Sequence, residues 1–150
     1  GLERELQTAD LIRALEKACL YDDLVSAVKK SSPELSGGDR YEESVIHRIL
    51  EMPVSEGGSN LSGGMRQRLS LARVFLRSPK IFILDESTAN LDEATSNAVL
   101  DNIEDYAKHI CAGMIYIAHN ENVVKRCDEV IELENRIHNN RKIKSQEYAA

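Results

Sequence analysis

The stretch that decides the fold is residues 61–92, which read LSGGMRQRLSLARVFLRSPKIFILDESTANLD. It opens with a serine and two glycines, continues as a helical pattern of apolar residues, and is broken by Pro79. Ile81–Leu84 then forms a short continuous apolar run, which is typical of a strand buried on both faces in a parallel sheet. The run ends in two carboxylates, Asp85 and Glu86.

The segments before this stretch have helical periodicity, whereas those after it alternate between strand and helix. We expect helices over residues 8–18, with Thr8 as the cap, 21–30, 41–52 and 65–76. Further along, we expect a helix capped by Asp92 that runs to about Lys108, a strand over Met114–Ala118, a short helix over 120–127, and a hairpin of Val130–Leu133 with Arg136–His138. Strand, helix and strand in this order predict a parallel pair with a right-handed crossover.

Two features of residues 61–92 can carry chemistry. Ligands of open α/β sheets bind at the carboxyl ends of the strands, where Asp85 can hold Mg²⁺ through water and Glu86 can orient and deprotonate an attacking water. A helix that begins after Ser62, Gly63 and Gly64 attracts phosphate, because its first N–H groups are unpaired and its end is partly positive. The structural alternatives are an ordinary strand end and an ordinary serine cap.

Taken together, the ordered motifs indicate a function far more specifically than either feature does alone. They are Leu61–Gly64, Arg66-Gln67-Arg68, Leu71-Ala72-Arg73, Pro79, Ile81–Glu86, Ser87–Asp92 and, at the end of the next expected strand, His119. In this order and spacing they resemble the ATPase domain of ABC transporters, from about Glu56 to about His138 and more weakly back to about Thr8. The resemblance implies a partial P-loop NTPase fold of the α/β class: a helical subdomain plus the C-terminal part of a mainly parallel core sheet.

The resemblance also implies a role for each motif. Leu61, Ser62, Gly63 and Gly64 match the signature motif, which contacts ATP held by the opposite subunit, and Asp92 closes the D-loop at the dimer interface. Asp85 matches the Walker B aspartate that serves Mg²⁺, and Glu86 matches the catalytic carboxylate that polarises water. His119 matches the switch histidine, whose imidazole can hydrogen-bond a phosphate oxygen. The implied cofactors are therefore ATP and Mg²⁺.

One motif of the family is absent from the sequence. A phosphate-binding loop needs GxxxxGK[ST], and no Gly-Lys-Ser or Gly-Lys-Thr occurs in the 150 residues. We therefore expect the C-terminal part of a longer ATPase domain, which binds little or no Mg-ATP alone and leaves Ile81–Leu84 as an exposed edge. We expect a helical subdomain over 1–80 with an insertion around 30–52, a core part over 81–138 and a loosely ordered tail over 139–150.

Composition limits the partners. A net charge of −6 argues against general nucleic-acid binding, and 42% hydrophobic residues argue against disorder. No apolar run approaches the roughly 18 residues that span a bilayer. The resemblance implies a second ABC ATPase domain as partner, in a homo- or heterodimer, and a transmembrane transport domain. It places a soluble chain on the cytoplasmic face of a membrane, and Glu56-Gly57-Gly58 resembles a linker of exporter-type domains.

Two alternatives to a transport ATPase stay open from the sequence. Structural-maintenance-of-chromosomes proteins also separate the phosphate-binding loop from the signature and Walker B half, although this chain has no heptad flanks and does have His119. The other alternative is a non-catalytic binding module that kept the fold, against which the presence of Glu86 and His119 argues. A second LSGG, Leu35–Gly38, is followed by Asp39 rather than a basic helix, so we interpret it as a loop.

Overall fold

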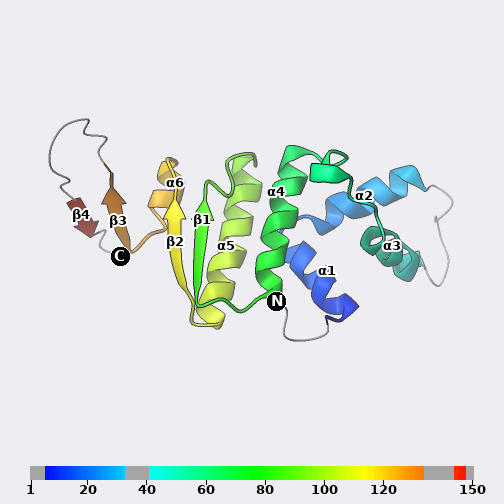
Figure 1. The fold of residues 1–150 in the computed structure, drawn as a ribbon, viewed down its shortest axis with the longest axis horizontal. Helices are drawn as coiled ribbons and strands as arrows, with labels where there is room; N and C mark the ends of the chain where they lie inside the picture. Colours follow the sequence, from blue (N-terminus) through cyan, green and yellow to red (C-terminus); the bar gives the residue numbers. More distant parts are fainter. Residues whose placement is uncertain (1–5, 33–40, 134–143, 148–150) are drawn as a thin grey trace.

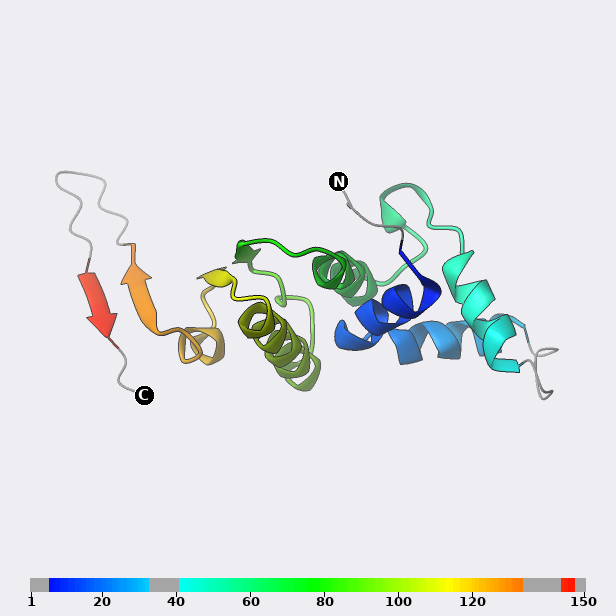
Figure 2. The ribbon, with the colours of Figure 1, turned by 90° about the horizontal axis from the view of Figure 1, so that it is seen from below.

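The computed structural model describes residues 6–32, 41–133 and 144–147. The chain is elongated, with helices at one end, a parallel strand pair backed by a long helix in the middle, and an antiparallel pair at the other end (Figures 1 and 2). None of the helices in these described ranges is long and apolar enough to cross a membrane. The second LSGG, residues 35–38, lies outside the described residues.

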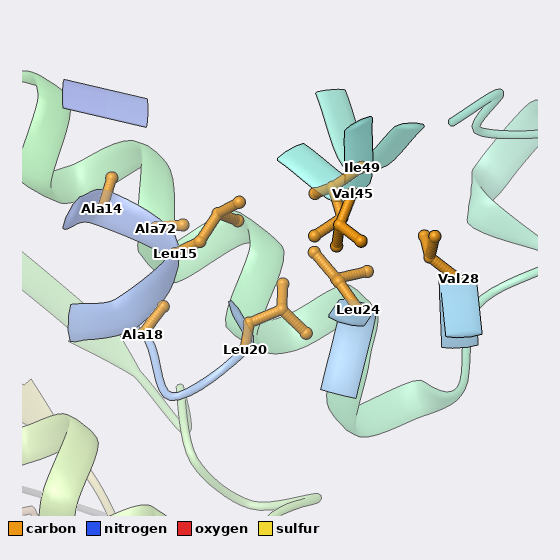
Figure 3. Close-up of a cluster of buried hydrophobic side chains, with 9 residues drawn as sticks. All are labelled: Ala14, Leu15, Ala18, Leu20, Leu24, Val28, Val45, Ile49 and Ala72. Carbon is orange, nitrogen blue, oxygen red and sulfur yellow. The ribbon is translucent and has the colours of Figure 1, made fainter. Parts of the chain in front are cut away.

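Four helices make up the helical end. They are α1 (Thr8–Lys17), α2 (Tyr21–Ser31), α3 (Tyr41–Leu50) and α4 (Gly63–Ala72). Their apolar faces meet in one cluster, in which Leu24 of α2 points toward Val45 of α3 (Figure 3). The buried members are Ala14, Leu15, Ala18, Leu20, Leu24, Val28, Val45, Ile49 and Ala72. Burial of this apolar surface is what holds the short helices together, because helices of about ten residues are marginal alone.

The ends of two helices differ from expectation. Thr8 is the first residue of α1 rather than its cap, which is Gln7, and the N–H of Gln7 donates to the Asp10 carboxylate at 3.1 Å. α4 begins at Gly63, two residues earlier than the apolar pattern indicated, and gives way after Ala72 to a 3₁₀ turn. The early start follows from the cap, because Ser62 accepts the Met65 N–H and so places Gly63 and Gly64 in the first turn of the helix.

The middle of the molecule is a strand–helix–strand unit. β1 (Ile81–Asp85) and β2 (Gly113–Ile117) pair in parallel, and α5 (Glu93–His109) connects them. The register places Asp85 opposite Ile117, so both strands end at the same edge of the sheet. Leu84 packs with the buried face of α5, whose buried residues are Val99, Leu100, Ile103 and Ala107. The parallel pair predicted from the sequence is confirmed.

The expectation that Ile81–Leu84 is buried on both faces is wrong. Phe82 and Leu84 are buried, whereas Ile81 and Ile83 are 59% and 66% exposed. On β2, Ile115 and Ile117 are each 50% exposed. The reason is that residues of the described chain cover only one face of this pair of strands. An apolar run indicates that both faces can be buried, but it does not say by what.

The partner expected for the C-terminal hairpin, Arg136–His138, lies outside the described residues. Within the described residues, β3 (Glu129–Glu132) pairs antiparallel with β4 (Lys144–Glu147). β4 also falls within 139–150, where we expected a loosely ordered tail. Its sequence, KSQE, has no apolar alternation, and the backbone hydrogen bonds that form a ladder leave no such mark in the sequence.

Candidate functional site

The carboxyl ends of β1 and β2 bring Glu86 and His119 together. His119 Nε2 lies 3.4 Å from Glu86 Oε1, and the two side chains are 92% and 55% exposed. The Glu86 N–H donates to the Ile117 carbonyl at 2.9 Å, which extends the parallel pairing by one residue beyond Asp85. The two catalytic residues predicted from the sequence are therefore neighbours, although they are 33 positions apart in the chain.

Both side chains line an open pocket of about 430 Å³. Its walls are the loop that follows β1, the first turns of α5 and the segment between β2 and α6 (Glu121–Val124). Thr88, Asn97, Asn120 and Asn122 add hydroxyl and amide groups to the lining. Asp85 is the last residue of β1 and is exposed. The pocket therefore offers two carboxylates (Glu86 and Glu93), one imidazole and several neutral hydrogen-bonding groups at the edge of a parallel sheet, the usual ligand position for this class of fold.

The signature residues lie at the N-terminus of α4. Ser62 caps the helix, since its Oγ accepts the Met65 N–H at 3.1 Å. A Cβ built on Gly63 would meet nothing nearer than Arg66 Nη2 at 4.0 Å, so a ligand can approach the backbone there. Ser62 and Gly63 are exposed. Leu61 is different, because its side chain is buried and only 8% exposed, so any contact of this residue with a nucleotide would be made by its backbone.

Gly64 lies against the loop that precedes α5. A Cβ built on Gly64 would stand 3.3 Å from Leu91 Cδ2 and 3.4 Å from the Asn90 carbonyl oxygen. A larger residue at position 64 would therefore push this loop away. The structure gives Gly64 a packing role at a contact between α4 and residues 90–91.

Asp92 begins α5 as its cap. Its Oδ1 accepts the Thr95 N–H at 2.9 Å. Hydrogen bonds from the backbone N–H and then the side chain of Thr95 hold the pKa of Asp92 below its usual range, so the group is anionic at neutral pH. The sequence predicted this cap. The structure confirms it.

Within the part of the chain that the structure describes, no hydrogen bond joins Ser62 or Gly63 to Glu86 or His119. The connection between these two sets runs through Gln67, which the sequence analysis did not single out as a site residue. Its side chain donates to the Glu86 carbonyl and accepts from the Asn90 N–H, both at 3.2 Å. A signal was available, because position 67 lies four residues after Gly63 and thus on the same helix face.

A second set of residues missed by the sequence analysis supports the far wall of the pocket. The Tyr116 hydroxyl donates to Glu104 Oε1 at 2.8 Å, and Arg126 Nη1 donates to both oxygens of Glu104 at 3.3 Å. Arg126 also pairs with Asp101 at 2.6 Å. Burial, and then the bond to Glu104, raises the pKa of Tyr116 far above its usual range. This network ties β2 and the turn after α6 to α5, on either side of His119.

The donor set can be compared with what Mg²⁺ and a nucleotide require. Mg²⁺ keeps several waters and takes one or two carboxylates beside phosphate oxygens. Among the described residues, no group of three or more His, Cys, Asp and Glu could enclose a metal ion. A single exposed carboxylate at Asp85 fits a Mg²⁺ that is held mainly by phosphates. The open N-terminus of α4 fits a phosphate oxygen.

Comparisons with known proteins place these features in a family. The family model described as "ABC transporter" matches residues 3–89. The lactococcin-G-processing and transport ATP-binding protein LagD of Lactococcus lactis subsp. lactis is 32% identical over 134 residues, which are 89% of this chain and 16% of LagD. The methionine import ATP-binding protein MetN of Photorhabdus laumondii subsp. laumondii is 41% identical over 73 residues, which are 48% of this chain and 21% of MetN.

A solved structure agrees with the sequence relatives. A bacterial Atm1-family ABC exporter with ATP bound shares the fold with a TM-score of 0.61 and 25% identity, over 87% of this chain and 18% of that chain. The chain therefore spans about a fifth or less of the length of these proteins. Its mixed α/β fold with parallel strands corresponds to part of an ABC ATPase domain. Because the family model covers more than half of its residues, this chain belongs to the ABC transporter family.

Proposed function

We propose that this chain is the C-terminal part of an ATPase domain whose ATP-dependent dimerisation and hydrolysis drive transport across a membrane. The observation that carries the proposal is the pairing of Glu86 with His119 at the carboxyl edge of a parallel strand pair. A carboxylate and an imidazole at 3.4 Å, open to a pocket, are the groups needed to orient a water molecule and to sense a phosphate oxygen.

Each of the site residues has a distinct role in this proposal. Glu86 accepts the proton of the attacking water, and His119 donates a hydrogen bond toward the phosphate end of the pocket. Asp85 would hold Mg²⁺ through water. Bound Mg-ATP supplies the phosphoanhydride bond that is broken and the metal that neutralises its charge. Ser62 and Gly63 offer the N-terminus of α4 to ATP held by an opposite domain, with Asp92 nearby in the same dimer interface.

The chain would not complete this site alone. Its sequence has no GxxxxGK[ST], and the apolar side chains of Ile81, Ile83, Ile115 and Ile117 are exposed on one face of the sheet. We propose that the part of the domain with the phosphate-binding loop covers this face. In that arrangement residues 1–80 form the helical subdomain, with an insertion around 30–52, and residues 81–138 belong to the ATPase core.

The proposed partners are a second ATPase domain and a transmembrane domain, at the cytoplasmic face of a membrane. The likeness to the exporter structure, which extends over 87% of the chain, supports export as the direction of transport. Glu56–Gly58 forms a 3₁₀ turn just before the signature, at the position where exporter-type domains have a similar linker.

Calorimetry with Mg-ATP tests the proposal. We expect no binding by this chain alone, and binding with hydrolysis once a separately produced segment that carries the phosphate-binding loop is added. In that assembly Glu86→Gln should keep binding and lose hydrolysis, by about a hundredfold or more, because a general base contributes 10²–10⁴. Glu121→Gln, which removes an exposed carboxylate near the pocket, is the matched control and should hydrolyse ATP normally. Tight binding by the chain alone, or unchanged hydrolysis by Glu86→Gln, would contradict the proposal.

A further inference from the structure

Gln67 of α4 is clamped between two backbone groups of the loop that follows β1. Its Nε2 donates to the Glu86 carbonyl and its Oε1 accepts the Asn90 N–H, each at 3.2 Å. The two contacts fix the orientation of the amide, because a carbonyl can only accept and an N–H can only donate. The Gln67 side chain therefore bridges the turn over residues 87–89 from one end to the other.

The residue that Gln67 holds has an uncommon backbone conformation. Glu86 has φ of +42°, in the left-handed region that residues with a Cβ rarely adopt. Such a conformation persists only where the surroundings hold it. Two further hydrogen bonds hold this residue: the Glu86 N–H donates to Ile117 at 2.9 Å, and the Ala89 N–H donates to the Glu86 carbonyl at 3.1 Å. Gln67 adds a bond from outside the sheet and the loop.

The same helix begins with the signature residues. Ser62 caps α4, and Gly64 packs against Asn90 and Leu91. Gln67 lies one turn further along, so it moves with the N-terminus of α4 as one rigid element. A shift of the signature end would change the bonds that hold the Glu86 backbone, and with it the direction of the carboxylate toward His119.

We propose that Gln67 is a positioning residue, which holds Glu86 in its left-handed conformation and couples the placement of the signature helix to the orientation of that carboxylate. This inference rests on the proposed function, in which Glu86 orients water. Gln67 does not touch the reacting atoms itself. Its effect therefore belongs to the rate of hydrolysis and not to nucleotide binding.

Two variants separate the two contacts of Gln67. Gln67→Leu keeps the size of the side chain and removes both hydrogen bonds. Gln67→Glu keeps the acceptor for the Asn90 N–H, but as a carboxylate it cannot donate to the Glu86 carbonyl. Ser70→Ala is the matched control, since Ser70 is exposed on the same helix and its hydroxyl donates to the Arg66 carbonyl of that helix.

The activity test uses the ATPase assembled from this chain and the loop-bearing segment. In both Gln67 variants we expect kcat to fall about tenfold to a hundredfold, because a displacement of about 1 Å has effects of that size. We expect KM for ATP to stay within about twofold and Ser70→Ala to match the unaltered protein. A variant that merely loosened the fold would change KM and kcat together. A normal kcat in Gln67→Leu, or in Gln67→Glu, would overturn the positioning role.

Amide hydrogen exchange of the chain alone tests the clamp without activity. In Gln67→Leu the Asn90 amide should exchange about fivefold faster, as expected for the loss of one hydrogen bond, whereas in Gln67→Glu it should stay protected. The Thr95 amide, held by Asp92, serves as the internal reference. Unchanged exchange at Asn90 in Gln67→Leu refutes the clamp. If the unaltered chain, assembled with the loop-bearing segment, fails to hydrolyse ATP, both the proposed function and the role of Gln67 are refuted. If the assembly hydrolyses ATP and the Gln67 variants have a normal kcat, only the role of Gln67 is refuted.

Discussion

Neighbouring residues of β1 differ sharply in burial, and this difference predicts very different costs of truncation. Leu84 is 5% exposed and packs against α5, so Leu84→Ala should lower the free energy of unfolding by about 3 kcal/mol, within the 2–5 typical of buried leucines. Ile83 is 66% exposed, so only about a third of its apolar surface is buried. A third of the roughly 1.5–3 kcal/mol for a fully buried side chain gives about 0.5–1 kcal/mol for Ile83→Ala.

Urea denaturation of the two variants, followed by circular dichroism, measures this difference. We expect Leu84→Ala to lose at least about 2 kcal/mol more than Ile83→Ala, with no change in the dependence on urea concentration. The same comparison in the presence of the loop-bearing segment should narrow the gap, since that segment is proposed to cover Ile83. Equal losses in the chain alone would mean that its outer sheet face is already covered, and the reasoning from one-sided burial would be refuted.

Three other features give predictions with a direct readout. Asp92→Ala should lower the midpoint of thermal unfolding at pH 7. Because the folded-state pKa of Asp92 is depressed, its stabilising contribution is present above about pH 4 and is lost as the pH falls below that value, so the difference in midpoint between variant and unaltered chain should shrink at the lower pH. Equal differences at pH 7 and at the lower pH would exclude this capping charge. Tyr116→Phe should lower the free energy of unfolding, measured by urea denaturation, by about 1 kcal/mol. In the near-ultraviolet spectrum it should remove a phenol whose pKa lies above its usual range. No loss in either measurement would mean that the hydrogen bond to Glu104 contributes nothing. Exposed Cys111 should react first with a thiol reagent. Burial raises the pKa values of Cys19 and Cys127, so their labelling rates should approach that of Cys111 as the pH rises. Peptide mapping that finds Cys127 labelled first at pH 7 would contradict this order.

The parts of the fold that could be predicted from sequence are those with a local physical signal. Ser62 and Asp92 each precede a helix and each accepts an N–H three residues later, as their side chains and positions indicated. The apolar run that ends at Asp85 is a strand, and it pairs in parallel with the next apolar run. Because both strands end at one edge, the adjacency of Glu86 and His119 followed from the topology.

The parts that could not be predicted depend on groups distant in sequence. The alternating burial of β1 reflects which face α5 covers, and a continuous apolar run cannot report this. β4 is formed by backbone bonds of a polar segment. The left-handed backbone of Glu86 is held by Gln67, 19 positions away, and by Ile117. The network of Tyr116, Glu104 and Arg126 likewise joins residues from β2, α5 and the turn after α6.

The exposure of the site and the exposure of the sheet have one physical explanation. Hydrolysis at a phosphate is fastest where water is excluded and the charged groups are surrounded by fixed dipoles. In this chain His119 is 92% exposed, Glu86 is 55% exposed, and the N-terminus of α4 is open. The isoleucines on the outer sheet face are open on the same two strands that end in this site. In the proposed assembly, the segment that covers that face would bury the isoleucines, and their apolar surface would supply binding energy. The polar residues at the strand ends would supply the chemistry of the site.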